Sequence, residues 1–168
     1  MLYKLYHGTH KKFRRFKLPE NVRGCEFPGL GIHFGTKKQA IYAIKKQVYA
    51  DVKPKSKKGE IHEIVVNIQN PLRLLDLEMW ESRDIASTLA KIGLFSQQEA
   101  QIIKHAFISK TARKKDLYQF RKAISWAGYD AIVYENKYEG DGDSYIIWNF
   151  KQIRKHKIEK CYPLPYLY

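Results

Sequence analysis

The stretch Glu60-Ile61-His62-Glu63-Ile64-Val65-Val66-Asn67-Ile68 is the clearest strand signal in the sequence. Ile64, Val66 and Ile68 alternate with less apolar neighbours, which is the two-residue period of a strand with one buried face. The strand must end at Asn70-Pro71, because proline cannot donate a hydrogen bond to an inner ladder. We therefore expect a strand over residues 60–68, with a brief continuation at Leu72–Leu75.

Helices are predicted on both sides of the residue 70 turn. Before it, residues 37–50 place apolar side chains at helical spacing and lysines on the other face. After it, three helices are expected, with a glycine ending the first at Gly93 and the last at Gly128. Ser96 and Glu99 form the capping box that starts the middle one.

The remaining strands lie at the two ends of the chain. They are expected at Leu2–His7, Ile32–Gly35, Ala131–Glu135 and Ser144–Phe150, with an edge strand at Ile153–Ile158 and loops over 9–28 and 52–59. Strands come first, helices are inserted and strands come last, which predicts an α+β fold with a mostly antiparallel or split sheet. We expect one domain over residues 1–168, with a variable helical insert at about 76–127.

Composition supports a folded globule and argues against several other classes. The chain has 168 residues, of which 44% are hydrophobic, enough for one domain with a substantial core. No apolar run approaches the roughly 20 residues of a membrane span, and no signal peptide is evident. Cys25 and Cys161 are far apart, which favours a reducing, cytoplasmic setting over a disulfide framework. No spacing of His or Cys indicates a metal site.

The net charge of +14 is the strongest compositional signal. Basic residues cluster at 11–17, 53–58, 113–115 and 154–157, a surface that would attract nucleic acid or another polyanion. A merely solvated basic surface explains the charge equally well, because charge carries no sequence code. One short loop of this basic chain is negatively charged, through Glu135, Glu139, Asp141 and Asp143.

Two short motifs carry the chemistry of the first third of the chain. Tyr6-His7-Gly8-Thr9 ends the first strand. Because Gly8 has no side chain, a ligand can approach its backbone closely, and the His7 ring can face the same cleft. Gly29-Leu30-Gly31-Ile32-His33-Phe34 follows a basic loop. It lacks the third glycine and the acidic residue of a dinucleotide-binding Rossmann fingerprint, so a Rossmann fold is rejected.

In order and spacing, these motifs resemble the core of the ADP-ribosyltransferases, including the poly(ADP-ribose) polymerases. That family carries a His-Gly pair, a Gly-x-Gly-Ile-aromatic-Phe segment, a helix with Ala-x-Tyr and a late Tyr-Ile strand. The corresponding residues here are His7-Gly8, Gly29–Phe34, Ala40-Ile41-Tyr42 and Tyr145-Ile146-Ile147. Asn70-Pro71-Leu72 and Gly128-Tyr129-Asp130 are also similar to transferase-like domains of phage polyvalent and bacterial toxin proteins.

The resemblance implies NAD as co-substrate and assigns roles to individual residues. His7 would hydrogen-bond the adenosine ribose, and the Gly8 backbone would hold the nicotinamide amide. Tyr42 would stack on the nicotinamide ring, with His33 on its other side. The same motifs place Thr9, Gly31, Phe34 and Ser144 among the residues that contact NAD. An alternative for Tyr42 is a core aromatic on an amphipathic helix.

The sequence departs from the family at the catalytic carboxylate, because Ser144 stands where the resemblance implies Glu. Cleavage of the nicotinamide bond builds positive charge on the ribose, which a carboxylate stabilises and a serine does not. The acidic loop supplies substitutes. Asp143 and Ser144 point to opposite faces of a strand, so Glu139 is the first candidate and Asp143 the second. A solvated hairpin turn is the alternative.

Three functions remain open on the sequence alone. The first is an enzyme that transfers ADP-ribose to a macromolecule, with RNA or single-stranded DNA favoured over protein, as a toxin or phage-linked effector. The second is a transferase fold without catalysis that binds NAD, ADP-ribose or RNA, which Ser144 favours. A plain RNA-binding domain is the third, but no RNA-recognition signature supports it. NAD glycohydrolase activity also stays open.

Overall fold

The computed structural model describes residues 1–18, 30–50, 59–78, 80–108 and 113–161. Its strands are β1 (Leu2–Thr9), β2 (Ile32–Phe34), β3 (Gly59–Asn67), β4 (Pro71–Arg73), β5 (Ala131–Glu135), β6 (Asp143–Ile147) and β7 (Ile153–Cys161). The helices are α1 (Lys37–Ala50), α2 (Ser82–Lys91), α3 (Gln97–Ile108) and α4 (Arg113–Trp126), with a 3-10 turn η1 (Phe150–Gln152) before β7. The predicted α+β class is confirmed.

The strands form two sheets instead of one. The first sheet has the order β1-β3-β7 and is wholly antiparallel, with β3 in the centre. The second has the order β2-β6-β5-β4, in which only the short β4 runs parallel to its neighbour β5. The split, mostly antiparallel arrangement predicted from the sequence is therefore present, and the strand at residues 60–68 occupies the middle of the first sheet.

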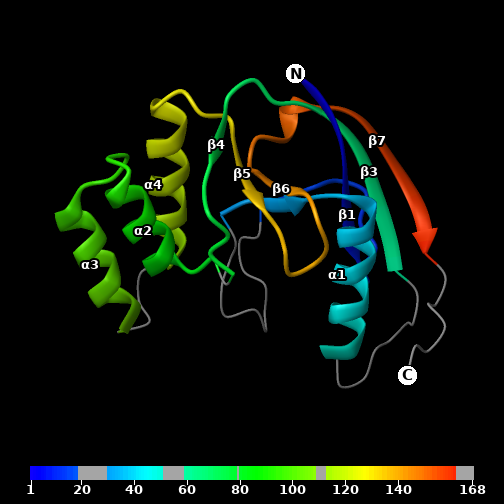
Figure 1. The fold of residues 1–168 in the computed structure, drawn as a ribbon, viewed down its shortest axis with the longest axis horizontal. Coiled ribbons are helices and arrows are strands. Elements are labelled where there is room, and N and C mark those ends of the chain that lie inside the picture. The colour runs from blue at the N-terminus through cyan, green and yellow to red at the C-terminus, as the bar shows by residue number, and fades with distance from the viewer. Residues whose placement is uncertain (19–29, 51–58, 79, 109–112, 162–168) are drawn as a thin grey trace.

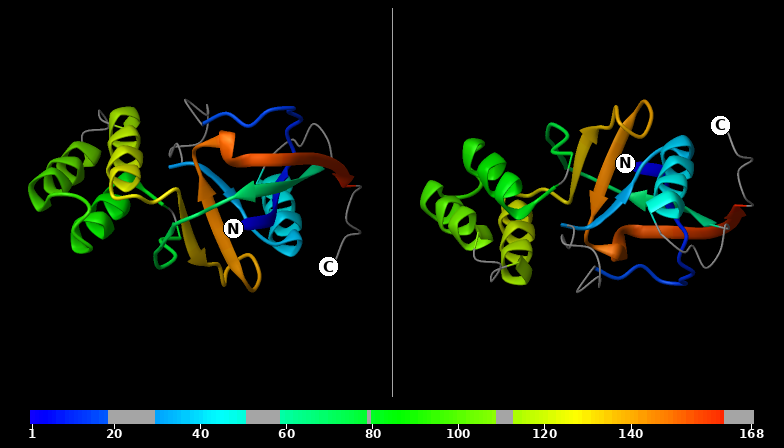
Figure 2. Two further views of the ribbon diagram at one scale, coloured as in Figure 1. Left: turned by 90° about the horizontal axis from the view of Figure 1, so that it is seen from above. Right: turned by 90° about the horizontal axis from the view of Figure 1, so that it is seen from below.

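The helices lie on opposite sides of the sheets. Figure 1 shows α1 beside β1 and β3, while α2, α3 and α4 gather at the far end of the molecule next to β4. The two views of Figure 2 show the same separation. Leu89 and Phe120 of the helices pack with Ile132 and Ile146 of the second sheet. None of the helices within the described ranges is long and apolar enough to cross a membrane.

A second core lies between the two sheets. Leu5, Ile64 and Val66 of the first sheet share one buried cluster with Phe34 and Ile147 of the second. Ile146 and Ile147, neighbours on β6, enter different clusters because strand side chains alternate between faces. The second sheet is therefore buried on both faces, which explains the nearly continuous apolar run in Tyr145-Ile146-Ile147.

Element ends differ from the sequence predictions where local hydrogen bonds decide them. α4 ends at Trp126, two residues before the predicted Gly128, where a φ of 89° and a 3.1 Å bond from the Tyr129 N–H to the Ile124 carbonyl close the helix end. β6 ends at Ile147, earlier than expected, because the Asn149 side chain accepts a bond from the Lys151 N–H and caps η1. The loops expected over 9–28 and 52–59 lie largely outside the described residues.

β1 and α1 approach so closely at Gly8 that no side chain fits there. A Cβ built on Gly8 would lie 1.8 Å from the backbone oxygen of Ala40. The sequence predicted that Gly8 lets a ligand approach the backbone, but the packing of α1 on β1 already requires a residue without a Cβ at this position. The contact fixes α1 beside the end of β1 that carries His7.

We expect Gly8→Ala to lower the free energy of unfolding by about 3 kcal/mol, the upper end for overpacking, because the clash is with backbone that cannot rotate away. Gly93→Ala is the control, because Gly93 has φ of 75° and no atom lies within 4 Å of a Cβ built on it. This substitution therefore reports only the cost of the backbone conformation, about 1–2 kcal/mol. Chemical denaturation measures both. Equal losses would contradict the packing role of Gly8.

Candidate active site

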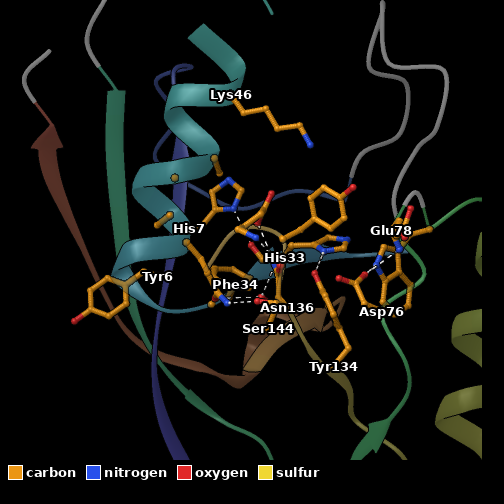
Figure 3. A pocket seen from close by; sticks show the side chains of 18 residues that line it. Tyr6, His7, His33, Phe34, Lys46, Asp76, Glu78, Tyr134, Asn136 and Ser144 are labelled. Carbon is orange, nitrogen blue, oxygen red and sulfur yellow. Dashed lines mark hydrogen bonds between the residues drawn. The ribbon is translucent and has the colours of Figure 1, made fainter. Parts of the chain in front are cut away.

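A cavity of about 510 Å³ opens where β1, β2, α1 and the β5–β6 hairpin meet. Its volume lies within the range of about 300–1,000 Å³ typical of small-molecule sites. Gln39, Ala40, Ala43 and Lys46 line it from α1, at positions that share one face of the helix. Figure 3 shows Lys46 reaching from α1, with Asp76 and Glu78 on the opposite side.

Backbone hydrogen bonds between the two sheets bring the two histidine motifs together. Tyr6 and Gly35 exchange two bonds of 2.9 Å, which join β1 to the end of β2. The Nδ1 of His7 then donates to the backbone carbonyl of His33 at 2.9 Å. A neutral His7 ring with its proton on Nδ1 presents Nε2 as an acceptor. His7 thus has the tautomer needed to accept a bond from a ligand hydroxyl.

His33 is held in the wall of the cavity by aromatic neighbours. Its Nδ1 is hydrogen-bonded to the Tyr134 hydroxyl at 2.8 Å, and Trp80 meets its ring edge-on at 5.9 Å. Burial, with a smaller contribution from His7, lowers the pKa of His33 to about 4. Burial also lowers the pKa of His7, against the effect of its bond to the His33 carbonyl. Both rings are therefore neutral at pH 7.

A chain of buried polar side chains joins α1 to the acidic hairpin. The Gln39 Nε2 donates to the carbonyls of Gly140 and Gly142 at 2.8 and 3.1 Å, and its Oε1 accepts from the Ser144 hydroxyl at 3.2 Å. Asn136 in turn donates from Nδ2 to the Ser144 Oγ at 3.1 Å. Gln39, Asn136 and Ser144 are all at most 3% exposed, so the network is shielded from water.

The network ends on the carboxylate of Glu139. Asn136 donates from the same Nδ2 to the Glu139 Oε2 at 3.2 Å, while its Oδ1 accepts from the Glu139 N–H at 3.0 Å. These two contacts fix both the backbone and the side chain of Glu139 beside the cavity, which it lines. Ser144, at the position where a catalytic Glu was expected, therefore supports a carboxylate five residues earlier in the chain.

The wall opposite α1 is acidic and has unusual backbone geometry. The Asp76 Oδ1 accepts from the Glu78 N–H at 2.9 Å and from the Trp80 Nε1 at 3.3 Å. Glu78 and Trp80 have φ of 56° and 50°, a region that residues other than glycine rarely adopt. Trp80 packs on Tyr134 with ring centroids 4.8 Å apart. This loop supplies both negative charge and aromatic surface to the cavity.

A family model described as ADP-ribosyltransferase in polyvalent proteins matches residues 1–160 of the chain. The chain belongs to this family. The resemblance read from the His-Gly and Gly-x-Gly motifs is thereby confirmed. No curated protein and no solved structure gives a significant match.

Six residues that the sequence analysis assigned to the transferase site line this one cavity: His7, Gly8, His33, Phe34, Glu139 and Ser144. Four others do not line it. Thr9 is buried and accepts a bond from the Lys11 N–H, and a Cβ on Gly31 would lie 2.6 Å from the Ile147 oxygen, so both are engaged in packing. Tyr42 and Asp143 are the other two.

Tyr42 and Asp143 differ most from their expected positions. Tyr42 is 41% exposed on α1, where Ala43 and Lys46 face the cavity instead, so it is neither a core aromatic nor part of the lining. Asp143 forms a two-bond ion pair with Arg73 of β4, at 2.6 and 3.1 Å, on the face of β6 opposite Ser144. The alternation of strand side chains predicted this opposition.

The sequence gave no signal for several lining residues. The role of Gln39 depends on contacts with residues about 100 positions away. Asn136 contacts Glu139 and Ser144, which the hairpin brings together. Asp76, Glu78 and Trp80 come from a loop between β4 and α2 that the sequence analysis assigned to the variable insert. Within the described part of the chain, no group of His, Cys, Asp and Glu side chains is arranged to hold a metal ion.

The lowered pKa of His33 makes stability depend on pH in a defined direction. Between pH 6.5 and 4 the unfolded chain binds a proton at this residue that the folded chain does not, so stability should fall as the pH is lowered through this window. The groups that face His33 are His7 and Tyr134. Denaturation at pH 4.5–7.5 should show a shallower fall for His33→Gln than for the parent. His105→Gln, on exposed α3 surface, should keep the parent slope, and an unchanged slope in His33→Gln would refute the assignment.

Proposed function

We propose that the protein transfers ADP-ribose from NAD to a macromolecular acceptor in the cavity between α1 and the β5–β6 hairpin. Membership of the ADP-ribosyltransferase family supports the class of reaction. The observation that carries the proposal is the anchored carboxylate of Glu139, which the Gln39–Ser144–Asn136 network holds at the cavity wall. In this proposal the Glu139 carboxylate would supply the negative charge that Ser144 lacks.

NAD would lie across the cavity with its adenosine ribose at His7 and its nicotinamide ribose at Glu139. A ribose hydroxyl would donate to the His7 Nε2, the acceptor left by the bond between its Nδ1 and the His33 carbonyl. The Gly8 backbone would hold the nicotinamide amide, and Trp80, Tyr134 or Tyr138 would supply the aromatic surface first assigned to Tyr42. Phe34 would contribute apolar contact.

In the reaction, the bond between the nicotinamide nitrogen and the ribose C1′ breaks, and its electron pair leaves with nicotinamide. The positive charge that develops on the ribose is stabilised by the Glu139 carboxylate. The acceptor nucleophile then bonds to C1′, and its proton passes to Glu139 or to solvent. Water as the nucleophile gives NAD hydrolysis by the same steps.

A nucleic-acid acceptor is favoured by the net charge of +14. Asp76 and Glu78 would keep phosphates away from the wall opposite α1, so a strand would approach from another side. A protein acceptor is the second candidate, and these two carboxylates are the observation in its favour. We further propose a role as a toxin or phage-linked effector in the cytoplasm, which rests on the resemblance of Asn70-Pro71-Leu72 and Gly128-Tyr129-Asp130 to transferase-like domains of phage polyvalent and bacterial toxin proteins. The alternative of a module that only binds NAD predicts no nicotinamide release.

Glu139→Gln should lower the rate of nicotinamide release from NAD by about 100- to 1,000-fold and leave NAD affinity nearly unchanged, because the carboxylate acts mainly as charge develops. Asp143→Asn is the matched control, since it removes a carboxylate four residues away that pairs with Arg73. An active Glu139→Gln with an inactive Asp143→Asn would move the catalytic role to Asp143. Full activity in both variants would exclude a catalytic role for the β5–β6 hairpin.

His7→Ala should weaken NAD binding by about 1–3 kcal/mol, the cost of losing a hydrogen bond in a partly buried site. Isothermal titration with NAD measures the change, and His105→Ala on α3 is the control for loss of a histidine away from the cavity. Circular dichroism verifies that both variants are folded. Unchanged affinity in folded His7→Ala would show that the ring does not contact NAD.

A further inference from the structure

A second cavity lies on the other side of His7. It has a volume of about 550 Å³ and is lined chiefly by His7, Phe13, Arg14, Arg15, Phe16 and Lys17. The two cavities share His7 and differ in charge. The first is lined by Asp76, Glu78 and Glu139 with a single lysine, whereas the second has three cations and no carboxylate among its lining residues.

Aromatic anchors hold this segment on the first sheet. His7, His62 and His156 lie on β1, β3 and β7 as a row across one face of the sheet. Phe13 stacks on His62 with ring centroids 4.1 Å apart and an interplanar angle of 14°, and Phe16 lies 5.0 Å from His156. Residues 13 and 16 therefore fix the backbone between them and the orientation of the side chains that follow.

The cations between these anchors and directly after them have no carboxylate partner. Arg14, Arg15 and Lys17 are exposed, and no carboxylate within the described ranges pairs with them. Unpaired guanidinium groups beside a partly exposed aromatic ring match the two parts of a nucleotide: arginine binds phosphate oxygens through paired N–H groups, and an aromatic face stacks on a base.

We propose that this second cavity binds a nucleotide of a single-stranded nucleic acid, with phosphates on Arg14, Arg15 and Lys17 and a base against Phe13. Only the role of that strand as an acceptor rests on the proposed function; the binding site itself does not.

The test measures binding of two probes, ADP and the oligonucleotide dT10, to the full chain. Arg14→Gln/Arg15→Gln removes two exposed cations from the cavity, and Lys91→Gln/Lys104→Gln removes the same charge from exposed surface of α2 and α3. We expect the arginine variant to bind dT10 at least tenfold more weakly and to lower the slope of log affinity for dT10 against log salt by about 1.4, from about 0.7 for each of two phosphate contacts. The lysine variant should change neither.

Each outcome decides the inference. Loss of dT10 binding in the arginine variant supports the inference, and loss confined to ADP would assign the cavity to a free mononucleotide and overturn it. If the arginine and lysine variants bind both probes as the parent does, or lose affinity equally, the second cavity is not a nucleotide site.

Nicotinamide release by the parent separates this inference from the proposed function. No release together with arginine-dependent binding would refute the function and leave the site. Nicotinamide release together with arginine-independent binding of both probes would refute the second-cavity site and leave the proposed function. Phe13→Leu adds a check on the base contact, because leucine keeps apolar packing on His62 and removes the stacking face. We expect it to weaken the binding of dT10 about tenfold.

Discussion

The pair of backbone hydrogen bonds between Tyr6 and Gly35 is the constraint on which the site depends. These bonds, each 2.9 Å, join the end of β1 to the end of β2 and so connect the two sheets. Because these bonds fix β1 against the end of β2, His7 lies beside the His33 carbonyl. α1 begins at Lys37, two residues after Gly35. The absence of a Cβ on Gly8 then lets α1 close one side of the cavity. The shape of the cavity therefore follows from backbone geometry before any polar side chain is considered.

The second constraint is the requirement that buried polar groups be paired. Gln39 projects from α1 into the turn of the β5–β6 hairpin and satisfies the carbonyls of Gly140 and Gly142. The Ser144 hydroxyl donates to the Gln39 side chain and accepts from Asn136. Asn136 also donates to the Glu139 carboxylate, where this series of hydrogen bonds ends. Ser144, at the position where the resemblance implies a catalytic Glu, is thus hydrogen-bonded into a network that reaches the Glu139 carboxylate. This network is the basis of the proposal that Glu139 supplies the catalytic carboxylate.

The sequence predicted the fold better than the site, for physical reasons. Periodicity and capping are local, so α1, β3, β5 and the helix end at Gly128 were recovered almost to the residue. The histidine motifs were found because each combines a strand end with a glycine. Gln39 was missed because its significance lies in contacts across about 100 residues. Asn136 was missed because its side chain gains its role only where the folded hairpin places it between Ser144 and Glu139. Tyr42 was placed in the site by analogy, although its position on α1 leaves it outside the face that Ala43 and Lys46 present to the cavity.

A crystal structure of the Glu139→Gln variant with NAD tests the central claim most directly, because this variant should bind the co-substrate without consuming it. The account predicts NAD in the cavity between α1 and the hairpin, with the adenosine ribose at His7 and the C1′ atom of the nicotinamide ribose within about 4 Å of the side chain at position 139, the range over which a carboxylate strongly stabilises a positive charge. NAD bound elsewhere, or with its nicotinamide ribose nearer to Asp143 than to position 139, would contradict it.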